Sequence, residues 1–274
     1  MSETDPQSSG IVQPLSVNSE GYRGQRIDIG SVLGELYAEA MDRSWASEVF
    51  YVSDRFELRA YRRGGALARS RLYVSAGIHG DEPAGPLACL RLVKETTWPE
   101  TLEVFLCPCL NPAGFDLNTR ENAHGVDLNR DYQDLKTAEI RAHAAWLGRC
   151  PDFDQSVILH EDWEASGFYL YELESEGITS IAEKIIHNVA TVCPIEPAAE
   201  IDGWPAVNGV IRPRVKPEDR SDWPEALFLS ARQGGQGHTL EAPSDFPLNV
   251  RVNALVAGTL AVVDQFRNHS VSSR

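Results

Sequence analysis

The chain has 274 residues, 42% of them hydrophobic, so it can bury a sizeable core as one large domain or two small ones. Its 40 Asp and Glu residues outnumber 25 Lys and Arg residues, which gives a formal net charge of −15. Such a surface repels phosphate backbones, so we expect no nucleic-acid partner. No apolar stretch approaches the ~18 residues that a membrane span requires, and we therefore expect no membrane partner.

The start of the chain has neither the basic residues nor the apolar core of a signal peptide. The five cysteines form no Cys-x-x-Cys pair, and three of them lie in apolar runs, which is typical of reduced core thiols. Both observations predict a cytoplasmic location. Residues 1–20 are polar, with Ser, Pro and Glu, and we expect a flexible tail ahead of one folded domain over residues 21–274.

The periodicity of apolar residues predicts the elements in chain order. A helix over 31–42 precedes strands over 47–54, 56–64 and 71–77, a helix over 84–95 and a strand over 101–111. A polar segment without clear periodicity covers 111–136. Then come a helix over 137–150, strands over 155–160 and 167–173, a helix over 178–192, a strand over 238–242 and a helix over 249–266. This alternation predicts a single α/β domain with a mixed central sheet and helices on both faces.

Polar residues gather at the predicted strand ends, where sheets of this kind carry their sites. The sequence GIHGDE places His79 and Glu82 after one strand, and its glycines allow a tight turn. A His-x-x-Glu pair alone is common by chance. A catalytic zinc site typically needs three protein ligands and an open position, so a third ligand should come from another strand end. His160 is the best candidate, and His238 is a second possibility.

The segment NPAGFDLNTRENAHGVDLNRDY (111–132) resembles a loop of the zinc metallocarboxypeptidase family, carboxypeptidase A-like, in which Asn-Pro-x-Gly leads to Gly-Val-Asp-Leu-Asn-Arg. GIHGDE resembles the first ligand pair of that family, ILHED its third-ligand strand and TLEAP its catalytic-glutamate strand, all in the family's order. The resemblance extends over residues 70–265. It is closest to compact bacterial members such as the murein peptide amidases.

This resemblance implies a zinc carboxypeptidase-like fold that binds one Zn²⁺ per chain through His79, Glu82 and His160. It further implies two catalytic residues, Glu241 as general base and Arg120 as the group that polarises the scissile carbonyl, and two substrate-binding residues, Asn129 and Arg130. The residue types suit these roles. A carboxylate can move the proton of the attacking water, a fixed cation stabilises an oxyanion, and a planar guanidinium binds a carboxylate through two hydrogen bonds.

One feature departs from the family, whose mobile tyrosine lies some twenty residues before the catalytic glutamate. Here no tyrosine follows Tyr171. Residues 205–237 carry several cations instead, and we expect them to form a different lid that favours acidic substrates. The residues are Arg212, Arg214, Lys216, Arg220, Trp223 and Arg232.

The leading prediction is a zinc-dependent hydrolase that cuts an amide bond next to a free carboxylate in a peptide or muropeptide. Murein peptide amidases, which it resembles, cut the γ-D-glutamyl–diaminopimelate bond of cell-wall peptides. An N-acyl amino acid deacylase, similar to aspartoacylase or succinylglutamate desuccinylase, is the alternative. Those enzymes carry a β-rich domain after the glutamate, whereas the stretch after Glu241 is short and largely helical. A third hypothesis is a zinc-pocket module that binds peptide termini without catalysis.

Overall fold

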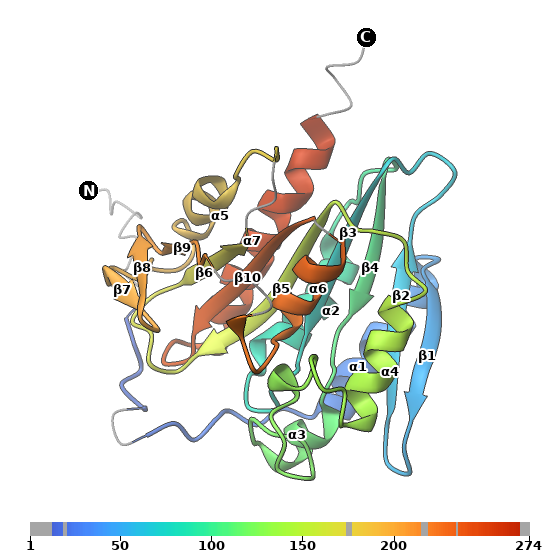
Figure 1. The fold of residues 1–274 in the computed structure, drawn as a ribbon, viewed down its shortest axis with the longest axis horizontal. Coiled ribbons are helices and arrows are strands. Elements are labelled where there is room, and N and C mark those ends of the chain that lie inside the picture. Colours follow the sequence, from blue (N-terminus) through green and yellow to red (C-terminus); the bar gives the residue numbers. More distant parts are fainter. Residues whose placement is uncertain (1–12, 19–20, 174–176, 215–218, 234, 269–274) are drawn as a thin grey trace, which may run out of the picture.

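A mixed ten-stranded sheet forms the centre of the protein, in the order β1-β2-β4-β3-β5-β10-β6-β9-β8-β7 (Figure 1). The computed structural model describes residues 13–18, 21–173, 177–214, 219–233 and 235–268. The strands are β1 Ala46–Val52, β2 Glu57–Arg63, β3 Ser70–Ala76, β4 Leu102–Cys107, β5 Gln155–Asp162, β6 Tyr169–Leu173, β7 Glu200–Ile201, β8 Trp204–Val207, β9 Val210–Ile211 and β10 Gln236–Pro243. The helices are α1 Ile29–Asp42, α2 Ala84–Glu95, α3 Pro112–Leu117, α4 Ala138–Leu147, α5 Ala182–Val189, α6 Glu225–Gln233 and α7 Leu248–Asn268, with a 3₁₀ turn, η1, over Leu128–Arg130.

Helices cover both faces of this sheet (Figure 1). The larger part of the core packs α1, α2, α5 and α7 against one face. A second apolar cluster packs α4 and α6 against the other. All six residues of β4 are buried, as expected of a continuous apolar run in a strand that is covered on both sides. The predicted fold class, a single α/β domain with a mixed sheet between helices, is confirmed.

The strands β3, β5 and β10 run parallel to one another in the middle of the sheet. Their carboxyl ends therefore meet at one edge, as expected for a site in an α/β sheet. Because β5 and β10 are in register, His160 and Glu241 are direct neighbours across the two strands.

Several elements were absent from the sequence-based prediction. The polar segment 111–136 contains the short helix α3 and the turn η1, and the segment 205–237 contains α6 and part of a small antiparallel meander formed by β7, β8 and β9. The predicted strand over 101–111 ends earlier, at Cys107. The predicted helix over 178–192 is confined to Ala182–Val189.

Most of the predicted N-terminal tail, residues 1–12 and 19–20, lies outside the described residues. Between these two stretches, the chain contacts the domain at Leu15, Ser16 and Val17, whose backbone N–H groups all donate to Asp245. The flexibility of residues 1–20 stays a prediction. Within the described ranges, no helix is both long enough and apolar enough to cross a membrane.

Candidate active site

The loop that carries His79 and Glu82 is fixed by two glycines. Gly77 adopts a φ of 64°, and its carbonyl accepts hydrogen bonds from the N–H groups of Leu110 and Asn111 at 3.1 and 2.8 Å. At Gly80 an added Cβ would lie 2.0 Å from the backbone of Gly114 in α3. The loop thus packs backbone to backbone against α3, an approach that only glycine permits.

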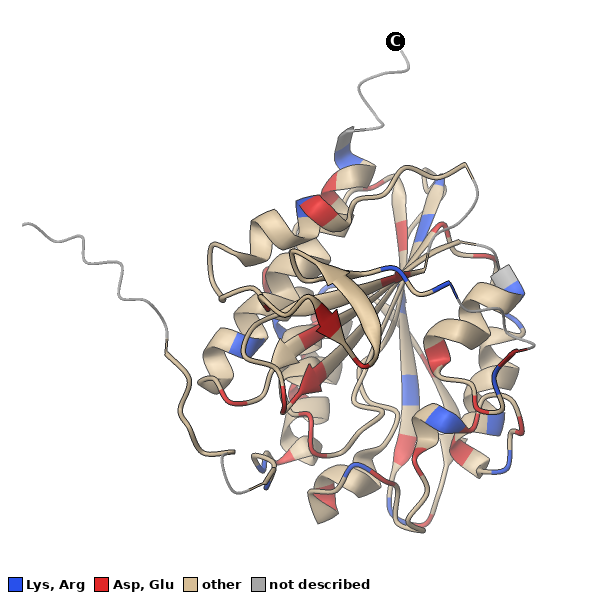
Figure 2. Ribbon diagram, turned by 60° about the vertical axis from the view of Figure 1, so that its left-hand side comes forward, with Lys and Arg blue, Asp and Glu red and all other residues tan. Residues whose placement is uncertain are grey.

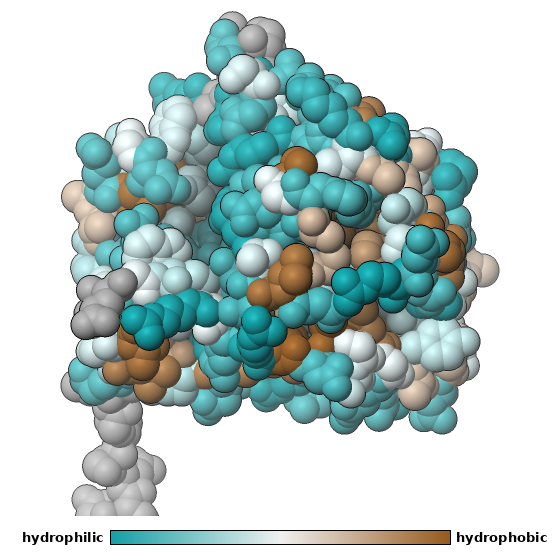
Figure 3. All heavy atoms as spheres, turned by 90° about the horizontal axis from the view of Figure 1, so that it is seen from below, coloured by the Kyte–Doolittle hydropathy of each residue, from teal (hydrophilic) through white to brown (hydrophobic). Residues whose placement is uncertain are grey.

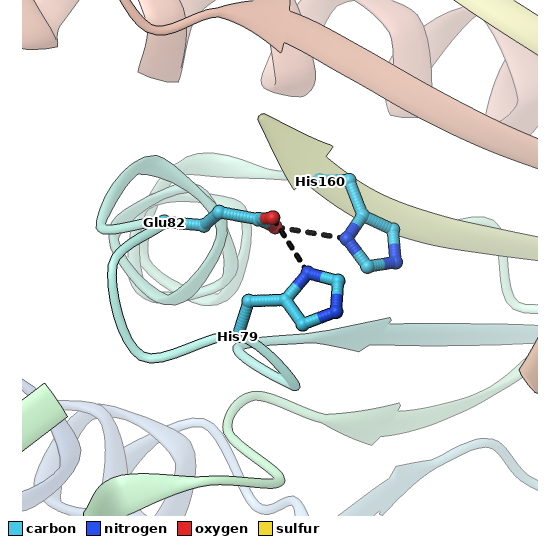
Figure 4. Close-up of side chains that lie close together, drawn as sticks. All are labelled: His79, Glu82 and His160. Atoms are coloured by element: carbon cyan, nitrogen blue, oxygen red, sulfur yellow. Dashed lines mark hydrogen bonds and ion pairs between the residues drawn. The ribbon is translucent and has the colours of Figure 1, made fainter. Parts of the chain in front are cut away.

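The three predicted metal ligands lie together and are buried (Figure 4). Nδ1 of His79 lies 2.6 Å from Oε1 of Glu82, and Nδ1 of His160 lies 2.8 Å from Oε2. One candidate ligand atom from each residue can be chosen so that all lie within 4.8 Å of one another. Two imidazoles and one carboxylate are a donor set that catalytic zinc sites use, so these side chains fit Zn²⁺.

The far side of each imidazole is held by the loop after α3. Nε2 of His79 lies 3.3 Å from Asp127, and Nε2 of His160 lies 3.4 Å from the side-chain nitrogen of Asn129. Burial acts to lower the pKa of His79, but the carboxylates of Glu82 and Asp127 outweigh it and the pKa is raised. Burial would raise the pKa of Glu82, yet the two histidines hold it well below its usual range. The site therefore favours an ionised Glu82, the form that binds a cation.

Glu161, next to His160, points to the opposite side of β5. Its carboxylate accepts from the backbone N–H of Ala84 at 2.6 Å, at the start of α2, and from the fully buried Arg251 of α7 at 2.5 Å. Its own N–H donates to Oε2 of Glu82 at 3.2 Å. This geometry gives Glu161 a structural role, because the residue ties α2 and α7 to the ligand-bearing strand.

Glu241 lies in a cavity of about 600 Å³ that also contains all three candidate ligands. The surface seen from below the view of Figure 1 is hollowed, with mainly hydrophilic residues around the hollow (Figure 3). Burial is the main cause that raises the pKa of Glu241 well above its usual value; Glu82 and Asp162 add to it, while His160 and Arg120 oppose it. Glu241 is thus placed to hold a proton beside the candidate metal site.

The predicted cations and the predicted amide line the same cavity. Nε of Arg120 lies 2.9 Å from Asp127, and its Nη1 lies 3.8 Å from Oε1 of Glu82. Arg130 is 44% exposed and pairs through Nε with Asp222 at 3.1 Å. The buried Asn129 accepts from the N–H of Glu225 at 2.9 Å and contacts His160. The structure therefore brings all seven predicted site residues together, while their roles stay predictions.

Acidic groups outnumber basic ones along this cavity. Arg120, Arg130 and Arg220 are its cations. Its acidic lining residues are Asp81, Glu82, Asp162, Glu164, Asp202 and Glu241, together with Glu161, whose carboxylate turns to Arg251. Figure 2 shows Asp and Glu residues on the arrowheads of the sheet and several Lys and Arg residues on the surrounding loops and helices.

The expected cationic lid over 205–237 is not formed by the described part of that segment. Arg212 pairs with the buried Glu172 and with Glu183 at 2.8 Å each, away from the cavity. Among the described cations of 205–237, Arg220 alone lines the cavity, and Lys216 lies outside the described residues. The prediction is therefore wrong for Arg212, whose side chain pairs with the buried Glu172 and the exposed Glu183 instead of lining the cavity.

The second possible ligand, His238, is placed away from the three candidate ligands. It is buried in β10 beside Glu172, three residues before Glu241 and hence on the opposite face of the strand. Its Nδ1 lies 3.9 Å from Glu172, and burial lowers the pKa of His238 to about 3. His160 is thus the better third ligand.

One buried acid beside the site escaped the sequence-based prediction. Glu225, the first residue of α6, accepts from the hydroxyls of Tyr73 at 2.7 Å and Ser75 at 2.9 Å. Tyr73 also contacts the buried His143, and the hydroxyl of Tyr132 contacts the same histidine at 2.7 Å. The N–H of Glu225 donates to the side chain of Asn129, and Asn129 contacts Nε2 of His160. This polar network therefore supports the ring of His160 on the side away from Glu82. In the sequence, the pair Pro224-Glu225 was the signal that could have indicated the start of this helix.

Comparisons with known proteins agree with this geometry. The family model for the succinylglutamate desuccinylase/aspartoacylase catalytic domain matches residues 68–145. The chain is 37% identical over 120 residues to murein peptide amidase A of Escherichia coli (strain K12), covering 44% of this chain and 47% of that protein. It is 35% identical over 107 residues to carboxypeptidase SOL1 of Arabidopsis thaliana, covering 30% and 21%. The chain thus matches less than half the length of these curated relatives.

Solved structures extend the similarity to nearly the whole fold. A metallopeptidase candidate from Shewanella amazonensis SB2B matches with a TM-score of 0.77 over 89% of this chain and 98% of that chain, at 23% identity. A metallo-carboxypeptidase from Burkholderia cenocepacia matches with a TM-score of 0.67 over 89% and 70%, at 14% identity. At these identities the matches show the fold alone. The sequence matches and the buried His-Glu-His set make the chain similar to zinc carboxypeptidase-like and succinylglutamate desuccinylase/aspartoacylase proteins.

Proposed function

We propose that this protein is a zinc-dependent hydrolase that cleaves an amide bond next to a free carboxylate. The observation that carries the proposal is the content of one cavity. His79, Glu82 and His160 meet there beside Glu241, and the guanidinium of Arg130 lines the same space. A metal site, a proton acceptor and a carboxylate-binding cation are the three parts that such a reaction needs.

The two histidines and Glu82 would hold the zinc ion. When bound, zinc supplies Lewis-acid chemistry, which polarises a carbonyl and lowers the pKa of water toward ~7. The remaining chemistry belongs to the side chains. Asp127 and Asn129 keep both imidazole rings turned toward Glu82, and Glu161 donates its N–H to the same carboxylate. Such supporting contacts fix the orientation of the ligands.

Glu241 would take the proton of the attacking water and deliver it to the nitrogen of the leaving amine. Its position next to His160 on the neighbouring strand puts the carboxylate beside the candidate metal site. Its pKa, which burial raises, suits a group that must both accept and release a proton. Arg120, held by Asp127, would stabilise the negative charge that develops on the carbonyl oxygen.

Arg130 would bind the carboxylate of the substrate, on the side of the cavity that faces α6. The guanidinium is half-exposed and shares Asp222 with Arg220, whose Nη2 lies 3.2 Å from that carboxylate. A substrate carboxylate would replace or join Asp222 at this pair of arginines. The amide of Asn129 is engaged with His160 and Glu225, which favours a role in positioning over direct binding.

The similarity to murein peptide amidase A supports a cell-wall peptide as substrate, and we propose such a peptide, cut in the cytoplasm, as the first to test. A specific observation favours a second candidate, an N-acyl amino acid deacylase. The family model that matches residues 68–145 describes succinylglutamate desuccinylase and aspartoacylase domains. Both reactions use the same cavity and differ in the acyl part of the substrate.

A substrate panel on zinc-loaded protein would separate these functions. It contains γ-linked peptides with a free carboxylate, α-linked peptides with a free C-terminus, and N-acetyl and N-succinyl amino acids. We expect the γ-linked peptides to give the highest kcat/KM. Preference for the N-acyl amino acids would establish the deacylase instead. Binding of peptides without hydrolysis of any member would contradict both and identify a binding module.

A further inference from the structure

Two N-terminal stretches, Leu15–Asn18 and Gly21–Gln25, together called the strap below, lie against the elements that carry the site. At one end, the backbone N–H of Leu15 donates to the carbonyl of Asp245 at 2.7 Å, and those of Ser16 and Val17 donate to its carboxylate. Asp245 follows β10, four residues after Glu241. At the other end, the side chain of Gln25 contacts Arg251 of α7. Both ends of the strap are therefore anchored beside the cavity.

Tyr22, within the strap, is part of the cavity itself. Its hydroxyl donates to the backbone carbonyl of Asp81, between the two ligands His79 and Glu82. Its ring stacks on Trp163, with centroids 6.2 Å apart and planes 20° from parallel. Both rings line the cavity, and Trp163 is 41% exposed. The hydrogen bond and the stacking fix a large, stiff pair of rings at this place, because aromatic side chains have few rotatable bonds.

The strap and Arg130 are attached to elements on opposite faces of the sheet. The strap contacts the loop that leads into α2 and also contacts α7, the helices of one face of the sheet. Asn129 and Arg130 belong to the other face, where Asn129 is bound by the N–H of Glu225 in α6. A substrate with its carboxylate at Arg130 and its scissile bond at the metal site must therefore extend its acyl part toward Tyr22 and Trp163.

We infer that Tyr22 and Trp163 form the end wall of the acyl side of the cavity and restrict the protein to substrates with a short acyl part. This inference rests on the proposed function, since it uses the substrate direction that Arg130 sets. A cavity of about 600 Å³ encloses a ligand of small-peptide size. A longer acyl part would meet the stacked rings, and moving them would break the contact of Tyr22 with Asp81.

The test compares substrates that share the residue with the free carboxylate and differ in the acyl part, from acetyl to one, two and four residues. For the wild-type protein, we expect kcat/KM to fall by at least about tenfold between two and four residues, as for a group that does not fit its pocket. Tyr22→Ala should reduce this fall to less than about threefold, because the wall is removed. Tyr22→Phe should keep the wild-type ratio, because the ring remains. Tyr37→Ala, at a half-exposed tyrosine of α1, is the matched control.

A purely structural role of Tyr22 would give a different result. Tyr22→Ala would then lower Tm or zinc content and reduce all activities equally, leaving the length ratio unchanged, and that outcome would overturn the inference. Asp245→Ala provides a second route, since it releases Ser16 and Val17 without touching the rings, and it should also flatten the ratio. An unchanged ratio in both Tyr22→Ala and Asp245→Ala excludes the wall.

Failure of the proposed function would be seen separately. If zinc-loaded wild-type protein hydrolyses no substrate, the Kd values of the same peptides are measured by calorimetry on Glu241→Gln protein, with and without Tyr22→Ala. A length-dependent Kd that Tyr22→Ala abolishes would support the wall even without hydrolysis. Equal Kd values for the two- and four-residue acyl parts would contradict it.

Discussion

His160 on β5 and Glu241 on β10 are register partners in a parallel pair of strands. Partners in such a pair project to the same side of the sheet, so the third candidate ligand and the candidate base point into one cavity. Glu161 is one residue further along β5, and its side chain points to the other face, where Arg251 binds it. The chemistry of the site therefore depends on a strand register that a shift of one residue would destroy.

Glu241→Gln should keep the zinc and the fold but lose about 10²–10⁴-fold in kcat, because the amide has the shape of the carboxylate but accepts no proton. Steady-state kinetics together with zinc analysis of the same preparation checks this. Turnover close to that of the wild type would assign the proton transfer to another group.

His79→Ala and His160→Ala should each abolish the binding of one zinc per chain, because an open three-ligand site cannot hold the ion tightly with two. Elemental analysis after dialysis measures the zinc content. His238→Ala is the matched control: it removes an equally buried histidine from the other face of β10 and should retain the metal. Full zinc content in His160→Ala would remove His160 from the ligand set.

Arg130→Ala should lower kcat/KM for a substrate with a free carboxylate by at least about 30-fold, since a lost charge pair in a binding site costs ~2–5 kcal/mol. With the matching amide substrate, the same variant should lose little more, because the charged contact is already gone. The comparison of two proteins with two substrates measures the coupling. If both losses simply add, Arg130 does not bind the carboxylate. Arg149→Ala, at an exposed arginine paired with Glu48, controls for the change in net charge.

Glu225 predicts a pH dependence of stability. Burial raises the pKa of Glu225 from 4.5 to about 7. A carboxyl with a higher pKa in the folded chain binds its proton more tightly there, so its contribution to the free energy of unfolding is full below pH 4.5 and lost as the pH rises through about 7. The loss amounts to roughly 3 kcal/mol.

Glu225→Gln cannot ionise, so its free energy of unfolding, relative to the wild type, should rise by roughly 3 kcal/mol from about pH 4.5 to about pH 8. Urea denaturation of both zinc-loaded proteins at several pH values measures the difference. Glu57→Gln, at an exposed carboxylate of β2, should show a flat difference. A flat difference for Glu225→Gln as well would show that Glu225 is ionised in the folded protein.

The sequence predicted those elements whose apolar pattern is regular. The helix over 84–95 was predicted at the residues where the structure has it, and the strand ends with His79 and His160 were located by their motifs. Shorter elements were missed although their signals were present. Asn111 caps α3, with Pro112 in its first turn, and Asp202-Gly203 and Asn208-Gly209 have the positive φ values of hairpin turns.

Other features leave no local signal. The contact of Tyr22 with Asp81 and the burial of Arg251 against Glu161 join residues far apart in the chain. An arginine in the first turn of an apolar helix and a tyrosine in a polar N-terminal segment look like surface residues when only their neighbours in sequence are considered. Their partners are set by the fold, and only the structure reveals them.

The hydrogen bond from Leu15 to Asp245 joins residues 230 positions apart, and it bears on how the protein is made. During synthesis the N-terminal segment leaves the ribosome long before β10 exists, and a contact of such separation forms late in folding. The contacts of Leu15, Ser16 and Val17 with Asp245 must therefore form after β10 has been made. A nascent chain that lacks β10 has neither Glu241 nor the Asp245 that follows it, so the candidate base and this anchor of the N-terminal stretch are acquired together.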